Sequence, residues 1–153
     1  MIMSFEMLRR YLDDVRWRTC AFTNGCFDII HMGHTKLLKE CTDWGCDYTI
    51  VGINSDISVK KIKNPSRPIM CEEERAEVID RIKGIDFVVL FDDPTPYKLI
   101  EMIEPTVLIK GGDWKGNVVG QEFVESYGGT VKIFPIEGTN STTNIIKKCR
   151  EAI

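Results

Sequence analysis

Both histidines of the 153-residue chain lie in one short segment, TNGCFDIIHMGH, which runs from Thr23 to His34. His31 and His34 are separated only by Met32 and Gly33. Two imidazoles at this spacing can stabilise the negative charge that develops on oxygen atoms when a phosphate is attacked. A helix that begins near Gly33 would add unpaired backbone N–H groups and the positive end of its macrodipole. The segment therefore predicts a phosphate-binding site with two candidate catalytic histidines.

The histidine pair also has a purely structural explanation. One histidine could cap a helix while the other packs as a side chain in the interior. The position of the pair favours catalysis, because the histidines follow a strand-like run, a glycine-containing turn and Phe27-Asp28. A glycine at position 33 would also let a polyphosphate approach the backbone closely.

A basic and irregular segment lies between Ser55 and Met70 and is interrupted by two prolines. It resembles a mobile surface loop. Its lysines can be a solvated charge run, or they can neutralise a polyphosphate when the loop closes over it. Candidate contacts to a substrate phosphate in this segment are Lys60, Lys63 and Arg67.

Two later segments place glycines or hydroxyl groups at a predicted element boundary. KGGDW begins at Lys110 after a strand-like run, and a tight turn is its ordinary explanation. Its glycines, Gly111 and Gly112, would also let a nucleoside approach the chain, with Asp113 as a polar selector.

STTNIIKK opens a predicted helix, where N-capping explains one hydroxyl but not three, so it indicates a second anion site. Its hydroxyl residues are Ser141, Thr142 and Thr143.

The apolar pattern predicts the elements that would hold these residues. Five short runs rich in Val, Ile and Phe are expected to be buried strands, at residues 15–22, 48–53, 86–91, 106–112 and 130–136. Five segments with helical periodicity follow them, at residues 33–44, 71–82, 95–103, 118–127 and 142–152. We therefore expect one α/β domain over residues 1–153, a Rossmann-like, doubly wound sheet of about five parallel strands with helices on both faces. Ligands should gather beyond the carboxyl ends of the strands.

Length, charge and cysteine spacing exclude several classes of function. A composition of 43% apolar and 28% charged residues is ordinary for one globular domain. The formal charge of −3 gives no general affinity for nucleic acid or anionic membrane. No apolar run could span a bilayer and no signal-peptide pattern opens the chain, so we expect a cytoplasmic protein. The six cysteines lack the spacing of a metal site or disulfide framework, which predicts reduced, mostly buried thiols.

GCFDIIHMGH matches the GxFDxxHxGH signature of the nucleotidyltransferase superfamily, which includes cytidylyltransferases and pantetheine-phosphate adenylyltransferase. The resemblance implies that a phosphorylated substrate attacks the α-phosphorus of a nucleoside triphosphate and releases pyrophosphate, commonly with Mg²⁺. It implies that Arg75, in a matching E-x-R segment, reaches a phosphate, and that Lys110 lies near the phosphates. The nucleotide contacts implied by the resemblance or predicted above are Thr23, Asn24, Gly25, Phe27, Asp28, Gly33, Asn54, Gly111, Gly112, Asp113, Ser141, Thr142 and Thr143. The catalytic set is His31, His34, Lys110 and Arg75, and no side chain is predicted to ligate a metal.

The combined pattern most resembles the family of D-glycero-β-D-manno-heptose 1-phosphate adenylyltransferases. It comprises TNGxFDxxHxGH, VxxNSD, SRP with E-x-R, KGGD[WY] and STTNIIKK, and it spans roughly Phe22 to Lys148. The resemblance implies transfer of the adenylyl group of ATP to a sugar 1-phosphate, a step in lipopolysaccharide or glycan precursor synthesis. It also implies a homodimer and a separate sugar kinase as the functional partner.

Alternatives remain open on the substrate and on catalysis itself. Cytidylyltransferases that act on glycerol 3-phosphate share the HxGH segment but carry an arginine shortly before S-T-[ST], and residues 134–140 contain none. This absence favours adenine over cytosine. Thr139 and Asn140 lie between the glycine and Ser141, where the heptose family usually has one residue, so another sugar 1-phosphate stays open. A regulatory domain that binds ATP without turnover is the third alternative, although it would not need both histidines.

Overall fold

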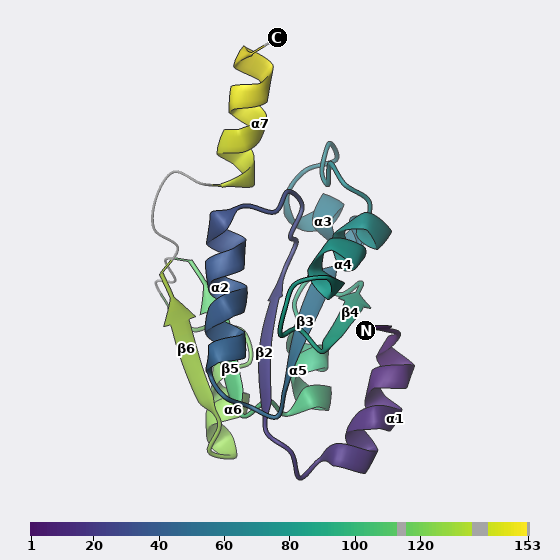
Figure 1. The fold of residues 1–153 in the computed structure, drawn as a ribbon, viewed down its shortest axis with the longest axis vertical. Coiled ribbons are helices and arrows are strands. Elements are labelled where there is room, and N and C mark those ends of the chain that lie inside the picture. The colour runs from purple at the N-terminus through teal and green to yellow at the C-terminus, as the bar shows by residue number, and fades with distance from the viewer. Residues whose placement is uncertain (113–115, 136–140, 153) are drawn as a thin grey trace.

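A computed structural model describes residues 1–112, 116–135 and 141–152. Within these ranges, six strands form one parallel sheet in the order β1-β4-β3-β2-β5-β6 (Figure 1). The strands are β1 (Ile2–Met3), β2 (Cys20–Gly25), β3 (Tyr48–Asn54), β4 (Phe87–Phe91), β5 (Val107–Gly111) and β6 (Thr130–Phe134). The order reverses between β2 and β5, which is where a doubly wound sheet opens a crevice for a ligand.

Helices cover both faces of this sheet, which confirms the predicted fold class. The described part of the chain contains α1 (Phe5–Val15), α2 (Met32–Asp43), α3 (Asp56–Ile62), α4 (Glu72–Asp80), α5 (Tyr97–Ile103), α6 (Gln121–Ser126) and α7 (Thr142–Glu151). Helices α2 and α4 pack on one face, whereas α1, α5 and α6 pack on the other. In Figure 1, α7 projects beyond the end of the sheet, and none of its described residues is buried. Helices long and apolar enough to cross a bilayer are not found in the described ranges.

Side-chain alternation explains why both faces of the sheet are apolar. Along β3, Ile50 faces the α1–α5 side, whereas Val51 faces the α2–α4 side, and both are completely buried. All seven residues of β3 are buried, as expected for a central strand covered on both faces. The covered centre leaves the carboxyl edge of the sheet as the place where polar side chains can meet a ligand.

Three elements were not predicted from the sequence, namely β1, α1 and α3. The strand expected from residue 15 begins instead at Cys20, because Val15 ends α1, a helix that buries Leu8 and Leu12 one turn apart. The expectation of a mobile loop from residue 55 is wrong for its first half. Ser55 caps α3 by accepting a hydrogen bond from the Ser58 N–H at 3.3 Å, so that Lys60 lies on a helix.

Leu38 tests how strongly α2 is held against the sheet. Its side chain is completely buried in the cluster that α2 and α4 form on the sheet. We predict that Leu38→Ala lowers the free energy of unfolding by about 3 kcal/mol, since it removes buried apolar volume and leaves a cavity. Urea denaturation measures this loss. Lys36→Ala on the exposed face of α2 is the control, and an equal loss in both variants would contradict the packing described here.

Candidate active site

A cavity of about 620 Å³ opens at the carboxyl ends of β2, β3 and β5, a size typical of small-molecule sites. Most of the residues predicted from the sequence line it, although they come from segments far apart in the chain. They are Asn24, Gly25, Phe27, Asp28, His31, His34, Asn54, Lys63, Arg67, Lys110, Gly111, Ser141, Thr142 and Thr143. The fold therefore brings the HxGH segment, the basic segment and the start of α7 to one cavity.

His31 is the N-cap of α2 and also lines the cavity. Its Nδ1 accepts a hydrogen bond from the Gly33 N–H at 3.1 Å. Because Nδ1 is an acceptor, the proton of the neutral ring is on Nε2, which can donate to a ligand. Helix capping, the ordinary explanation considered from the sequence, therefore holds for this histidine. Capping does not compete with a role in the cavity, because the two nitrogens serve different partners.

The His34 imidazole stacks on the His31 ring at the cavity and lies near the tilted ring of Phe27. Its centroid lies 3.8 Å from that of His31 and 5.2 Å from that of Phe27. Burial and, to a smaller extent, the nearby His31 together lower the pKa of His34 to about 4, although the Ile29 backbone carbonyl opposes the shift. Burial also lowers the pKa of His31. Both rings are therefore neutral at pH 7, where they can donate hydrogen bonds without carrying charge.

Lys110 places the ammonium group of a half-buried side chain at the end of β5. Its Nζ donates to Asn24 Oδ1 at 3.2 Å, which ties the ends of β5 and β2 together. Burial lowers the pKa of Lys110, and the positive charge of Lys63 lowers it further, whereas Cys26 acts in the opposite direction. The cavity therefore has a cation on the strand next to the one that leads to the histidines.

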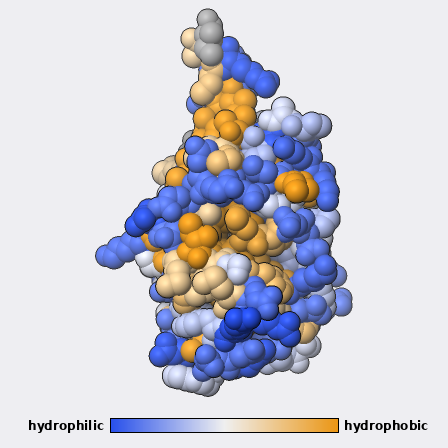
Figure 2. Space-filling view, turned by 90° about the vertical axis from the view of Figure 1, so that its right-hand side faces the viewer, coloured by the Kyte–Doolittle hydropathy of each residue, from blue (hydrophilic) through white to orange (hydrophobic). Residues whose placement is uncertain are grey.

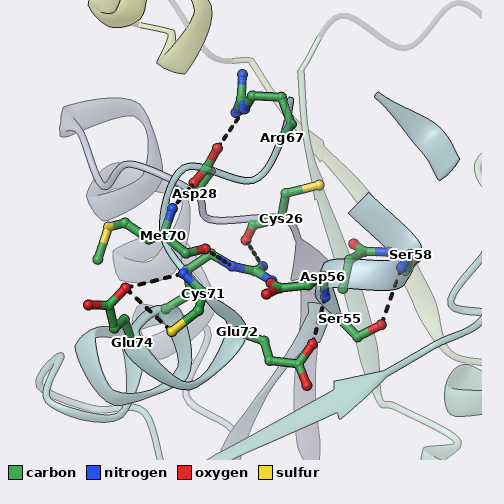
Figure 3. A network of polar contacts seen from close by, with 12 residues as sticks. Cys26, Asp28, Ser55, Asp56, Ser58, Arg67, Met70, Cys71, Glu72 and Glu74 are labelled. Atoms are coloured by element: carbon green, nitrogen blue, oxygen red, sulfur yellow. Dashed lines mark hydrogen bonds and ion pairs between the residues drawn. The ribbon is translucent and has the colours of Figure 1, made fainter. Parts of the chain in front are cut away.

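Asp28 and Arg67 form an ion pair at the side of the cavity, with Arg67 Nε donating to Asp28 Oδ2 at 2.6 Å. Asp28 Oδ1 accepts hydrogen bonds from the N–H groups of Ile69 at 2.8 Å and Met70 at 2.9 Å. The Asp28 side chain is only 1% exposed, so its carboxylate oxygens serve the chain itself (Figure 3). Asp28 therefore lines the cavity and also anchors residues 67–70, and the predicted contact of its side chain with the nucleotide stays a prediction.

Arg75 does not reach the cavity, which corrects the prediction that it contacts a phosphate. It is completely buried, because it lies on the side of α4 that faces the sheet and the turn after β2. Its guanidinium donates to the Met70 carbonyl at 3.1 Å, to the Cys26 carbonyl, and to Asp56 Oδ1 at 2.8 Å. A completely buried side chain with these partners supports the turn and does not line the cavity.

Several other predicted residues are not among those that line the cavity. Thr23 is completely buried within β2, and Gly33 is buried in the first turn of α2. Lys60 is on the exposed side of α3. Gly112 has a φ of 114° and donates its N–H to the Phe134 carbonyl at 3.0 Å, so it serves a turn. Asp113 lies outside the described residues.

The cavity also contains wall residues that were not selected from the sequence. They are Cys26, Leu37, Ile62, Pro94, Thr95, Pro96, Leu108, Val118 and Val119. Residues 94–96 follow β4, so the rule that ligands gather beyond strand ends could have identified them. The pair at 118 and 119 carried no such signal, because two valines before a helix resemble core residues.

The cysteines and acidic residues give no sign of a metal centre. Among the described residues, no three His, Cys, Asp or Glu side chains are grouped so that they could hold a metal ion. All six cysteines are free, as predicted, but only Cys20 and Cys41 are buried, so the expectation of mostly buried thiols is wrong.

Comparison with known proteins defines the class. The family model described as cytidylyltransferase-like matches residues 22–148, and the chain belongs to this family. This match confirms the nucleotidyltransferase class that the HxGH segment predicted. Bifunctional protein HldE from Syntrophotalea carbinolica is 45% identical over 148 residues, which are 92% of this chain and 30% of that protein. HldE from Geotalea uraniireducens is 48% identical over 139 residues, or 90% and 28% of the two chains. The chain thus spans about three-tenths of these relatives.

Solved structures show the same fold. A lipopolysaccharide core biosynthesis protein from Thermoplasma volcanium has a TM-score of 0.64 and 27% identity, covering 80% of this chain and 99% of its own. A pantoate-beta-alanine ligase from Francisella tularensis, in complex with beta-gamma ATP and beta-alanine, has a TM-score of 0.67 and covers 91% of this chain and 68% of its own. Its identity of 13% makes it evidence for the fold alone.

The low pKa of His34 predicts a dependence of stability on pH. Above pH 6.5 the ring is neutral in the folded and unfolded states, but between 6.5 and about 4 only the unfolded chain binds the proton. The free energy of unfolding should therefore fall as the pH falls through this range. We predict that His34→Gln makes the fall shallower, as measured by urea denaturation at a series of pH values. Lys36→Gln, on an exposed part of the same helix, should keep the wild-type slope. A wild-type slope in His34→Gln would contradict the buried, neutral imidazole.

Proposed function

We propose that this chain transfers the adenylyl group of ATP to a sugar 1-phosphate, specifically D-glycero-β-D-manno-heptose 1-phosphate. The observation that carries the proposal is the meeting of His31, His34, Lys110 and the start of α7 around one cavity. The resemblance of the sequence motifs to the heptose 1-phosphate adenylyltransferases supports the choice of base and sugar. The named relatives support it only in part, because this chain covers about three-tenths of their length.

The reaction needs no protein nucleophile. An oxygen of the sugar phosphate, already ionised at neutral pH, forms a bond to the α-phosphorus of ATP while the bond from that phosphorus to the bridging oxygen breaks. The electron pair of the broken bond leaves with pyrophosphate. Catalysis then consists of alignment and stabilisation of the charge that moves to the leaving group. Neutral imidazoles of His31 and His34 can donate to these oxygens, and the Lys110 ammonium can neutralise them.

The start of α7 supplies the second group of phosphate contacts in this proposal. Ser141 caps the helix by accepting a hydrogen bond from the Asn144 N–H at 3.1 Å. The Thr142 hydroxyl donates to the Ile29 carbonyl at 3.5 Å, which links the helix to the HxGH segment. The Asn144 N–H is already bonded to the Ser141 hydroxyl. A terminal phosphate at the positive end of the helix would therefore meet the N–H groups of Thr142 and Thr143.

Lys63 and Arg67 are proposed to bind the phosphate of the acceptor sugar. Both line the cavity, and Lys63 directly follows α3. Among the described residues, Arg67 donates a side-chain hydrogen bond through Nε alone, to Asp28. Its two terminal NH₂ groups would then form the bidentate contact that suits a phosphate.

Further parts of the proposal concern cofactor, partners and location. We propose that Mg²⁺ enters with ATP on the triphosphate oxygens, that two chains form a homodimer, and that the reaction takes place in the cytoplasm. We also propose that a sugar kinase, distinct from the residues of this sequence, supplies the sugar 1-phosphate. The relatives are described as bifunctional, which supports a second activity linked to this one, and α7, which has no buried residue, offers a surface for pairing of chains.

A matrix of substrates tests the proposed specificity. Purified protein is incubated with ATP or CTP against heptose 1-phosphate, another sugar 1-phosphate and glycerol 3-phosphate, and pyrophosphate release is measured. We expect the highest kcat/KM for ATP with heptose 1-phosphate. The highest kcat/KM for CTP with glycerol 3-phosphate would establish the cytidylyltransferase alternative. Binding of ATP without pyrophosphate release in any combination would establish the regulatory alternative.

Replacement of either histidine tests the proposed chemistry. We predict that His31→Ala and His34→Ala each lower kcat by about 10²-fold or more, since each removes a donor to the developing charge. The KM for ATP should change much less, because the triphosphate keeps its contacts to Lys110 and to the start of α7. Steady-state kinetics separate the two parameters, and Lys36→Ala on the same helix is the control. Equal effects on kcat and on ATP binding would refute the assigned role.

A further inference from the structure

A closed ring of contacts surrounds the turn between β2 and the HxGH segment. Arg75 donates through Nε to the Met70 carbonyl at 3.1 Å and through Nη1 to the Cys26 carbonyl. The Met70 N–H donates to Asp28 Oδ1 at 2.9 Å, as Figure 3 shows from close by. Because Cys26 and Asp28 are joined through Phe27, these three hydrogen bonds close a ring that contains this residue.

Phe27 is the residue that the ring constrains. Its φ of 49° lies in the left-handed region, which is unfavourable for a side chain of this size. Such a conformation persists only where the surrounding structure holds it. The Phe27 side chain is 2% exposed, and its ring lies 5.2 Å from the His34 imidazole between centroids. The backbone conformation of Phe27 therefore decides how closely the His34 ring is covered.

Arg75 suits this position better than an apolar side chain of similar volume would. It is completely buried, and its guanidinium reaches two backbone carbonyls and Asp56 Oδ1 from one planar group. A buried charge with these partners avoids the cost of an unpaired one. Lysine would keep the charge but could not present donors to three acceptors in this fixed geometry.

Arg75 also connects this ring of contacts to the first residue of α3, through Asp56. Asp56 begins α3, the helix that leads to Lys63, and its N–H donates to Glu72 Oε2 at 2.6 Å. Asp28 holds Arg67 through the ion pair at 2.6 Å. The same buried group of residues therefore supports both the histidine side and the side proposed to bind the acceptor phosphate.

We propose that Arg75 and Asp28 are positioning residues, which hold Phe27 in its left-handed conformation and thereby fix the His34 imidazole at the cavity. Neither residue needs to touch a substrate for this purpose. The consequence for catalysis rests on the proposed function, in which His34 stabilises the leaving group. The consequence for the His34 ring itself does not, because it can be measured without any substrate.

The pKa of His34 reports directly on how well the imidazole is covered by Phe27. In the wild-type chain we expect it near 4, because the ring is buried beside Phe27. In Arg75→Gln and in Asp28→Ala, release of Phe27 should admit water to His34 and raise its pKa by about one unit or more toward 6.5. An NMR titration of the 153-residue chain measures this, and the chain has only two histidines to assign. His31→Gln identifies the remaining signals.

Matched variants separate a positioning role from a general loss of structure. Arg81→Gln removes an exposed arginine that follows α4 and pairs with Glu77, and it should leave the titration of His34 unchanged. The double variant Arg75→Gln/Asp28→Ala should shift the pKa of His34 no further than the more affected single variant. Both changes break the same closed ring of hydrogen bonds around Phe27. Arg75→Lys should give a smaller shift than Arg75→Gln. If Arg75→Gln does not fold, Asp28→Ala and Arg75→Lys carry the same test.

Adenylyl transfer provides the second measurement. We expect Arg75→Gln to lower kcat by about 10- to 100-fold, as a small displacement of a catalytic group does, with little change in the KM for ATP. A folded variant with a wild-type His34 titration would overturn the proposal, and so would a raised pKa with a wild-type kcat. A raised pKa in a protein whose wild-type form shows no transfer at all would support the positioning of His34 and would refute the proposed function instead.

Discussion

Parallel pairing of β2 with both β3 and β5 is the constraint on which the site depends. Phe22 is paired with Leu108, and the same register two residues further on brings Asn24 opposite Lys110. The hydrogen bond of 3.2 Å between these two side chains joins segments 86 residues apart. Because parallel strands end at a common edge of the sheet, these two side chains are close enough to form a direct hydrogen bond. A shift in this register would move the lysine away from the histidines.

Charge in the cavity is divided between permanent cations and neutral donors. The chain as a whole has a formal charge of −3, so attraction of a polyanion has to be local. Lys63, Arg67 and Lys110 line the cavity, whereas His34 stays neutral because burial lowers its pKa to about 4. Neutral donors bind a ground-state triphosphate less strongly than cations do. In the proposed reaction, their hydrogen bonds can therefore strengthen as charge moves to the leaving group, which is the condition for catalysis.

Buried polar contacts behind the cavity hold residues 26–28 in a defined turn. The segment from Cys26 to Asp28 has a non-glycine residue with positive φ and would not hold this conformation alone. Arg75 from α4 binds one end of it and Met70 binds the other. Helix α4 starts at the correct place because Cys71 and Glu74 form a capping box at its first turn. A helix boundary in one segment thus fixes the backbone of another.

The sequence by itself determined the class of fold, the histidine site and most of the cavity wall. Alternating apolar runs and helical segments are local patterns, and the GxFDxxHxGH segment keeps its own spacing whatever surrounds it. Only the tertiary structure decided the role of Arg75, because an E-x-R segment looks the same whether its arginine faces a ligand or the interior. It likewise assigned Asp28 to residues 67–70 and placed Val118 in the cavity wall. These outcomes depend on which distant segments the sheet brings into contact. A local sequence pattern does not contain that information.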